Sequence, residues 1–273
     1  MRHLLNTFSR LRSILVAITT TFLLLSLGFP SFALEGVSPK LAVRAISTFL
    51  KFDNAVADSE IVRLSTIAKQ PGGTKIVGKE LGKLRLPNDV LEDTYLRIAI
   101  YHGKLSRPEA EGMLQRLRST PGFRSTLSKV IGASEVKTSG HLNELRIADN
   151  ASQHGFQVKG IGVRFDDGMK HGETDIDVLL SRGKSRIAIE AKDYLPSTEI
   201  PIDKFRSDFI SLAQYSKQQA PLRVITVFSL TNKPHDELIL RRLAKEATKN
   251  GVELIVGSPE QQIIQINQLQ RIL

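Results

Sequence analysis

The spacing of the apolar residues divides the chain into two parts. Between residues 39 and 131 the apolar residues recur at helical spacing, and almost no stretch alternates as a strand would. Helices are predicted over residues 39–52, 59–69, 89–102, 107–118 and 121–131. Asn88, Ser106 and Thr120 stand where N-caps are expected. We therefore predict a small all-α domain in this part of the chain.

The pattern changes after residue 140. A helical pattern at residues 141–149 is followed by a predicted strand at residues 156–165, in which Gly160 and Gly162 indicate a bulge. Two more strands flank a turn at residues 181–184. Helix 205–219, strand 222–230, helix 237–250 and strand 252–256 complete the series. This order predicts an α/β domain, joined to the helices by a polar linker at residues 132–140.

The first residues have the pattern of a targeting segment. Arg2, Arg10 and Arg12 precede an almost wholly apolar run at residues 13–29, and Ser31 and Ala33 offer a cleavage-compatible spacing of small residues. A secretory signal peptide over residues 1–33 is predicted, which makes the protein exported, either periplasmic or secreted. The alternative is an uncleaved membrane anchor formed by residues 13–29. The predicted domains are then residues 34–133 and 134–273.

The amino-acid composition limits which kinds of site the protein can contain. The 273-residue chain has no cysteine, which excludes disulfides and cysteine-ligated zinc. Residues 34–133 hold 16 basic and 10 acidic residues, a net charge of +6, whereas residues 134–273 hold 19 and 18. Ordinary solvation of exposed helix faces is the favoured explanation of this excess of positive charge, and contact of the helical part with nucleic-acid phosphates is the alternative. Nucleotide-binding, serine-hydrolase and dinucleotide motifs are missing from the sequence, and the histidines lack metal-ligand spacing.

Charged residues interrupt the predicted hairpin. Strand alternation places Glu190 and Lys192 on one face, and Asp177 shares that face if the two strands pair through the turn at residues 181–184. Burying such charges costs several kcal/mol per ion unless they are paired or bind a metal. A divalent-metal site is therefore predicted, with a salt-bridged edge strand as the alternative.

An acid on one strand followed by acid-x-Lys on the next resembles the PD-(D/E)xK, or restriction-endonuclease-like, nuclease superfamily. Here the matching residues are Asp177 and the run Glu190, Ala191 and Lys192. Glu144, beside the apolar stripe of the predicted helix at residues 141–149, matches the helical acid of the family. The resemblance covers roughly the second half of the chain. It implies an αβββαβ core with a central mixed sheet, here preceded by the all-α domain and the signal peptide.

The resemblance also implies a chemistry. Asp177 and Glu190, with the backbone carbonyl of Ala191, would bind magnesium, with manganese as a substitute. Lys192 would position or deprotonate the attacking water, and Glu144 would orient a water. Asp175, two residues before Asp177, would point the same way and support the site.

These residues predict an exported magnesium-dependent hydrolase, a nuclease that cleaves phosphodiester bonds, with DNA favoured over RNA. Two other functions stay open. One is a toxin-like effector domain whose partner is an inhibitor or immunity protein. The other is a non-catalytic module that binds nucleic acid or protein and has kept the nuclease fold.

Overall fold

The computed structural model of the protein describes residues 56–168, 173–200 and 202–272. The predicted signal peptide and the predicted helix at residues 39–52 lie outside these residues. Within the described ranges, the helices are all too short or too polar to cross a membrane.

Five helices make up the first described part: α3 Asp58–Ala68, α4 Gly73–Lys83, α5 Asn88–Tyr101, α6 Arg107–Leu117 and α7 Phe123–Val130. Four of them confirm predicted helices. The exception is α4, which the sequence did not predict because glycines interrupt its short apolar pattern. The helices bury a shared set of apolar side chains, among them Leu64, Val77, Ile98, Met113 and Leu127.

The helix caps show which sequence signals were reliable. Ser106 caps α6 as predicted, because its side chain accepts from the Glu109 N–H in a capping box. The prediction of Thr120 as a cap was wrong, since Gly122, at a φ of 86°, holds that position before α7. Asn88 is the first residue of α5 rather than its cap. Glycine takes the left-handed conformation that a side chain at position 122 would resist.

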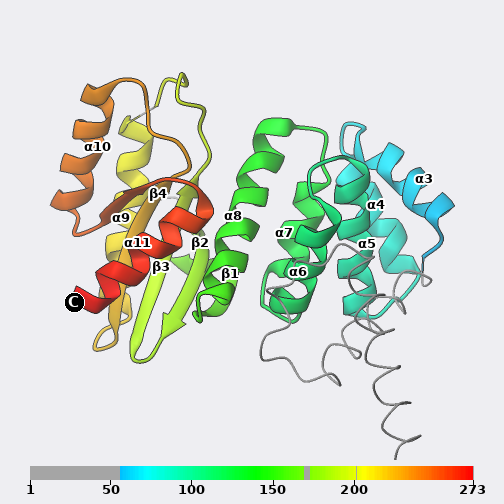
Figure 1. Cartoon of the computed structure of the whole chain (residues 1–273), viewed down its shortest axis with the longest axis horizontal. Coiled ribbons are helices and arrows are strands. Elements are labelled where there is room, and N and C mark those ends of the chain that lie inside the picture. The colour runs from blue at the N-terminus through cyan, green and yellow to red at the C-terminus, as the bar shows by residue number, and fades with distance from the viewer. Residues whose placement is uncertain (1–55, 169–172, 201, 273) are drawn as a thin grey trace, which may run out of the picture. The chain divides into compact units, whose positions relative to one another are not determined.

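Helix α8, Glu135–Gln153, connects the two parts of the described chain. The predicted linker was wrong over most of its length, because the helix begins at Glu135 directly after its cap, Ser134. The linker residues are polar because that first turn is exposed, not because it lacks regular structure. Figure 1 shows α8 between the helices and the sheet, where it packs against α6 and α7 on one side and against three strands on the other.

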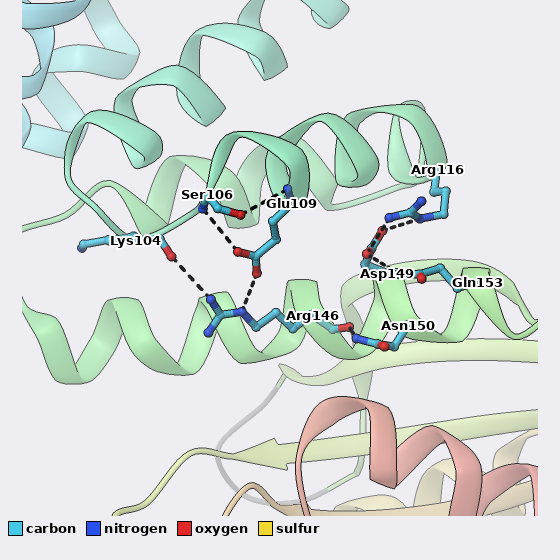
Figure 2. Close-up of polar contacts among 8 residues, drawn as sticks. All are labelled: Lys104, Ser106, Glu109, Arg116, Arg146, Asp149, Asn150 and Gln153. Atoms are coloured by element: carbon cyan, nitrogen blue, oxygen red, sulfur yellow. Dashed lines mark hydrogen bonds and ion pairs between the residues drawn. The ribbon is translucent and has the colours of Figure 1, made fainter. Parts of the chain in front are cut away.

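Two ion pairs join α6 to α8 (Figure 2). The guanidinium of Arg116 donates to both carboxylate oxygens of Asp149, at 2.7 and 2.9 Å. Nε of Arg146 donates to Oε1 of Glu109 at 2.7 Å, on the carboxylate that also completes the α6 capping box. Because the paired groups are partly buried and the first pair is bidentate, these contacts fix the register of one helix on the other.

The sheet has five strands: β1 Gln157–Asp166, β2 Glu173–Arg182, β3 Ser185–Lys192, β4 Arg223–Leu230 and β5 Glu253–Val256. Their spatial order is β1-β2-β3-β4-β5. The first three pair antiparallel, and β4 and β5 continue parallel to β3. The predicted bulge in β1 is confirmed by the register shift between Val158 and Gly160. The chain is therefore α/β with a mixed sheet, as predicted.

Helices cover both faces of the sheet (Figure 1). Helices α9 Ile202–Gln218 and α10 Glu237–Lys249 pack together over β3, β4 and β5, and α11 Pro259–Ile272 lies with α8 on the other face. Helix α11 was not predicted, since glutamines interrupt its apolar spacing. The aromatic core under α9 contains Phe205, Phe209 and Phe228, all fully buried. Strand β3 is covered on both sides, which explains why its successive residues Ile187, Ala188 and Ile189 are all apolar and buried.

Candidate active site

Strands β2 and β3 stop pairing at one end. Their antiparallel ladder runs from Arg182 and Ser185 to Val178 and Ile189 and no further. Beyond that pair β2 continues beside β1 and β3 beside β4. The next positions in register are Asp177 and Glu190. They lie opposite each other where the two strands separate, as the predicted hairpin requires.

The side chain of Asp177 replaces a missing ladder contact. Its Oδ2 accepts the backbone N–H of Ala191 at 2.8 Å. This hydrogen bond anchors the carboxylate of β2 beside the backbone of β3 at the Glu190-Ala191-Lys192 run. A backbone donor satisfies one lone pair and leaves the rest of the carboxylate available to a ligand.

The acidic residues share the face of the sheet that α9 covers. Leu179 and Ala188 belong to the core under α9, and strand alternation puts Asp177, Glu190 and Lys192 on the same face. The contact of Lys192 with α9 confirms that it lies on this face, because its Nζ is 5.6 Å from the centre of the ring of Phe205 on that helix. The three predicted hairpin residues are therefore brought together.

Helix α8 brings a further pair to this end of the sheet. Glu144 is buried, and its Oε1 lies 2.8 Å from Nδ1 of His141. The hydroxyl of Ser139 donates to the carboxylate of Asp193, the residue after Lys192, which ties the start of α8 to the end of β3. Glu144 is near enough to Asp177 to raise the pKa of that carboxyl group.

A residue of α9 that the sequence did not single out completes the group. Lys192 forms an ion pair with Glu190, and its Nζ also lies 3.0 Å from Oδ2 of Asp208. The side chains are 20%, 14% and 23% exposed for Lys192, Glu190 and Asp208 respectively, so these charges are largely withdrawn from water.

Burial alters the ionisation of the two opposed carboxyl groups. Desolvation, then repulsion from Glu190 and Glu144, raises the pKa of Asp177 well above its ordinary value. Desolvation, with added repulsion from Asp208 and Asp175, raises the pKa of Glu190 to about 7, although Lys192 opposes the shift. Carboxyl groups held together against their own repulsion gain most when a cation arrives.

Lys192 keeps its positive charge in this environment. Desolvation alone would lower the pKa of its ammonium, but Glu190, Asp208 and Asp177 together outweigh that effect and raise it. In the metal-free protein the ammonium is thus the cation that offsets the acidic cluster. It is suited to hold a water or a phosphoryl oxygen rather than to accept a proton at neutral pH.

The donor set fits a divalent cation. Magnesium and manganese prefer carboxylate and carbonyl oxygens, which Asp177, Glu190 and the backbone at Ala191 supply on one side of the strand ends. Among the described residues, no group of three or more acidic or histidine side chains is already arranged to hold a metal ion. The carboxylate of Glu190 instead contacts Lys192, which a bound cation would displace.

A cavity of about 370 Å³ lies elsewhere, lined by residues of α6, α8 and the start of α11. Its charged walls are Arg116, Arg146, Glu109, Asp149 and Glu260. The first four are paired with one another, as Figure 2 shows, and serve the packing of α6 on α8. We place the candidate site at the strand ends, because the opposed carboxyl groups with shifted pKa values and the largely buried Lys192 lie there.

Comparison with protein-family models, curated proteins and solved structures found no match to this chain. The assignment of the site therefore depends on its own geometry.

The structure brings together Asp177, Glu190, Ala191 and Lys192, and it places Glu144 close to Asp177. Asp175 is exposed but lies near enough to Glu190 to raise its pKa. Sequence reasoning missed two neighbours. His141 stands three residues before Glu144, a spacing that places both on one helix face. Asp208 adjoins the buried Phe205 and Phe209 stripe, where an acid is unexpected.

Proposed function

We propose that the protein is a metal-dependent nuclease that hydrolyses phosphodiester bonds of nucleic acids, with a core of the PD-(D/E)xK kind. The observation that carries this proposal is the placement of Asp177 opposite Glu190 where β2 and β3 separate, with Lys192 on the same face. The order α8, β1, β2, β3, α9, β4 also agrees with that core. DNA is the favoured substrate.

Each residue has a role that its position supports. Asp177, Glu190 and the carbonyl of Ala191 would hold magnesium, which, when bound, supplies Lewis-acid chemistry to the phosphodiester. Lys192 would place its ammonium beside the phosphoryl oxygens and offset the charge that grows as the bond breaks. Glu144, held by His141, would accept a hydrogen bond from the attacking water and orient it.

A salt-bridged strand without catalytic function is the competing explanation. It accounts for the ion pair between Glu190 and Lys192. It does not account for Asp177, whose partly buried carboxyl group is held by a backbone N–H, or for Glu144 beside it. The carboxylates of Glu190, Asp208 and Asp177 surround the single ammonium of Lys192 and leave an excess of negative charge. A divalent cation would neutralise that excess.

A cleavage assay tests the proposal directly. Purified protein would be incubated with supercoiled plasmid, single-stranded DNA and transfer RNA, in magnesium, in manganese or in a chelator. We expect cleavage with either metal, none with chelator, and faster cleavage of DNA than of RNA.

The matched control is a carboxylate outside the site. Glu253→Gln alters an exposed strand residue of β5 and is expected to cleave as the wild type does, whereas Asp177→Asn is expected to be inactive. Cleavage that persists in Asp177→Asn, or that ignores the chelator, would reject the proposed mechanism.

A further inference from the structure

Lys192 is held by carboxylates from two different elements. Glu190 lies on its own strand, and Asp208 comes from α9, with its Oδ2 3.0 Å from the ammonium. That oxygen is buried and makes no hydrogen bond to the described part of the chain, so the ion pair is what compensates its charge. Asp208 adjoins Phe205 and Phe209, which are fully buried and fix α9 on the sheet.

The two carboxylates would be affected differently when a cation binds. Glu190 faces Asp177 across the separated strands and is a proposed ligand. A carboxylate that ligates a divalent cation compensates a neighbouring ammonium less well. Lys192 is only 20% exposed, and a buried ammonium that loses its partner is costly. Asp208 stands on a separate element and can keep that ion pair.

We propose that Asp208 is a positioning residue, which keeps the ion pair with the ammonium of Lys192 when a divalent cation binds to Glu190. This inference rests on the proposed function. In the metal-free protein, Lys192 occupies the acidic cluster in place of the metal. In the metal-bound protein, Asp208 retains the ammonium at the edge of the cluster, where the phosphate would lie. The position of the lysine is then set by α9 and not by the hairpin.

The proposal distinguishes Asp208 from a ligand and from a purely structural ion-pair partner. A ligand would matter to metal binding whether or not Lys192 is present. A structural partner would stabilise the fold equally with and without metal. A positioning residue affects metal binding only through Lys192, so its effect vanishes when the lysine is removed.

Calorimetric titration of magnesium into four forms of the full-length protein tests this: wild type, Asp208→Asn, Lys192→Met and the double variant. We expect Asp208→Asn to weaken magnesium binding by about tenfold, because displacing the ammonium then leaves it unpaired. Lys192→Met should bind at least as tightly as the wild type, since the competing cation is gone. The double variant should bind as Lys192→Met does.

Asp203→Asn is the control for an acid of α9, since Asp203 pairs at the surface with Arg206 and should leave the affinity unchanged. Asp208→Glu keeps the charge and should restore most of the missing affinity. Circular dichroism melts without metal would show that each variant is folded. For cleavage, Asp208→Asn should lower kcat more than it raises KM, because the lysine acts on the reacting phosphate.

Equal weakening by Asp208→Asn in the presence and absence of Lys192 would make Asp208 a ligand and overturn the proposal. An unchanged affinity in Asp208→Asn would also overturn it, as would failure of Asp208→Glu to restore binding. If the wild type binds neither magnesium nor manganese, the proposed function fails and this inference with it. The wild-type titration therefore separates the two failures.

Discussion

Asp177 faces Glu190 one register position beyond the last paired residues of β2 and β3, and its carboxylate accepts the N–H of Ala191. The separated strands leave the two acids side by side with no backbone ladder between them. Desolvation raises the pKa of both carboxyl groups, and repulsion from Glu190 raises that of Asp177 further. The fold tolerates this repulsion, and binding of a cation would relieve it.

Replacing Asp177 by Asn is expected to separate stability from function. The amide oxygen can still accept the Ala191 N–H, while the repulsion with Glu190 and Glu144 disappears. The metal-free variant should therefore be as stable as the wild type or more stable, by up to about 1–2 kcal/mol. It should also lose the magnesium-dependent stabilisation, which is about 2.7 kcal/mol at a hundredfold excess over Kd. Thermal melts with and without magnesium measure both effects.

A structural role for Asp177 predicts the opposite sign. Loss of a buried charge partner strands the other charge and costs about 3–5 kcal/mol with or without metal. If Asp177→Asn melts far below the wild type, and the wild type itself ignores magnesium, the nuclease assignment is wrong. Glu253→Gln provides the baseline for an exposed strand acid.

Replacing Lys192 by Ala should keep metal binding and remove most cleavage. In the proposed mechanism the ammonium does not ligate the cation but offsets phosphoryl charge, and loss of one such group costs about 10²–10³ in kcat. The metal-free fold should lose stability, since Glu190 and Asp208 lose their common partner. Magnesium should then restore more stability in this variant than in the wild type. A Lys192→Ala protein that cleaves normally would remove the lysine from the mechanism.

The sequence predicted those parts of the fold that have a strong local period. The order from α8 to β5 and the hairpin register follow from alternation and from one glycine turn at Gly183, where φ is 59°. It failed where local signals mislead. Helix α4 is rich in glycine, α11 is interrupted by glutamine, and the start of α8 is polar because it is exposed.

The candidate site was predictable where its residues are close in sequence. Asp177, Glu190 and Lys192 follow from the pairing of adjacent strands. Asp208 belongs to a helix that crosses over the sheet, so its distance to Lys192 depends on how α9 packs, which no local pattern encodes. His141 was discounted because it lacks the spacing of a metal ligand, yet it contacts Glu144 instead.

Stability of the metal-free protein should fall as the pH rises from about 4.5 to about 7. The ordinary pKa of Glu190 is 4.5 and its pKa in the fold is about 7, so in this window the folded protein binds more protons than the unfolded chain. The loss is complete above pH 7 and absent below 4.5, and is on the order of 1–3 kcal/mol. Chemical denaturation between pH 4.5 and 8 measures it.

Two controls test whether this change of stability with pH, measured as a slope, comes from Glu190. Glu92, buried in α5, also has a pKa raised to about 7, mainly by desolvation, so Glu92→Gln should remove its own share of the slope. Saturating magnesium should remove only the part of the pH dependence of stability that comes from Glu190 and Asp177, because metal binding favours their ionised forms. If magnesium leaves the slope unchanged at every pH, these carboxyl groups do not bind the metal.

The basic residues of the helical part should set the salt dependence of nucleic-acid binding. Lys75, Lys79 and Lys83 are exposed at four-residue intervals along one face of α4. Replacing all three by Ala preserves helix propensity and removes up to three ammonium groups that could bind phosphates. Each lysine–phosphate pair contributes about 0.9 to the slope of log affinity against log salt for duplex DNA. We therefore expect the slope to shrink by that amount for each phosphate that the variant no longer binds.

A second basic face allows a matched comparison. Arg241, Lys245 and Lys249 have the same spacing on α10 and are also exposed. Their replacement by Ala removes the same charge and tests whether the effect of α4 is local or merely reflects net charge. Fluorescence anisotropy with a labelled duplex, in the chelator to prevent cleavage, gives both slopes. A smaller slope only in the α4 variant supports phosphate binding by the helical part, whereas equal slopes in both variants and the wild type would show that the α4 lysines are simply solvated.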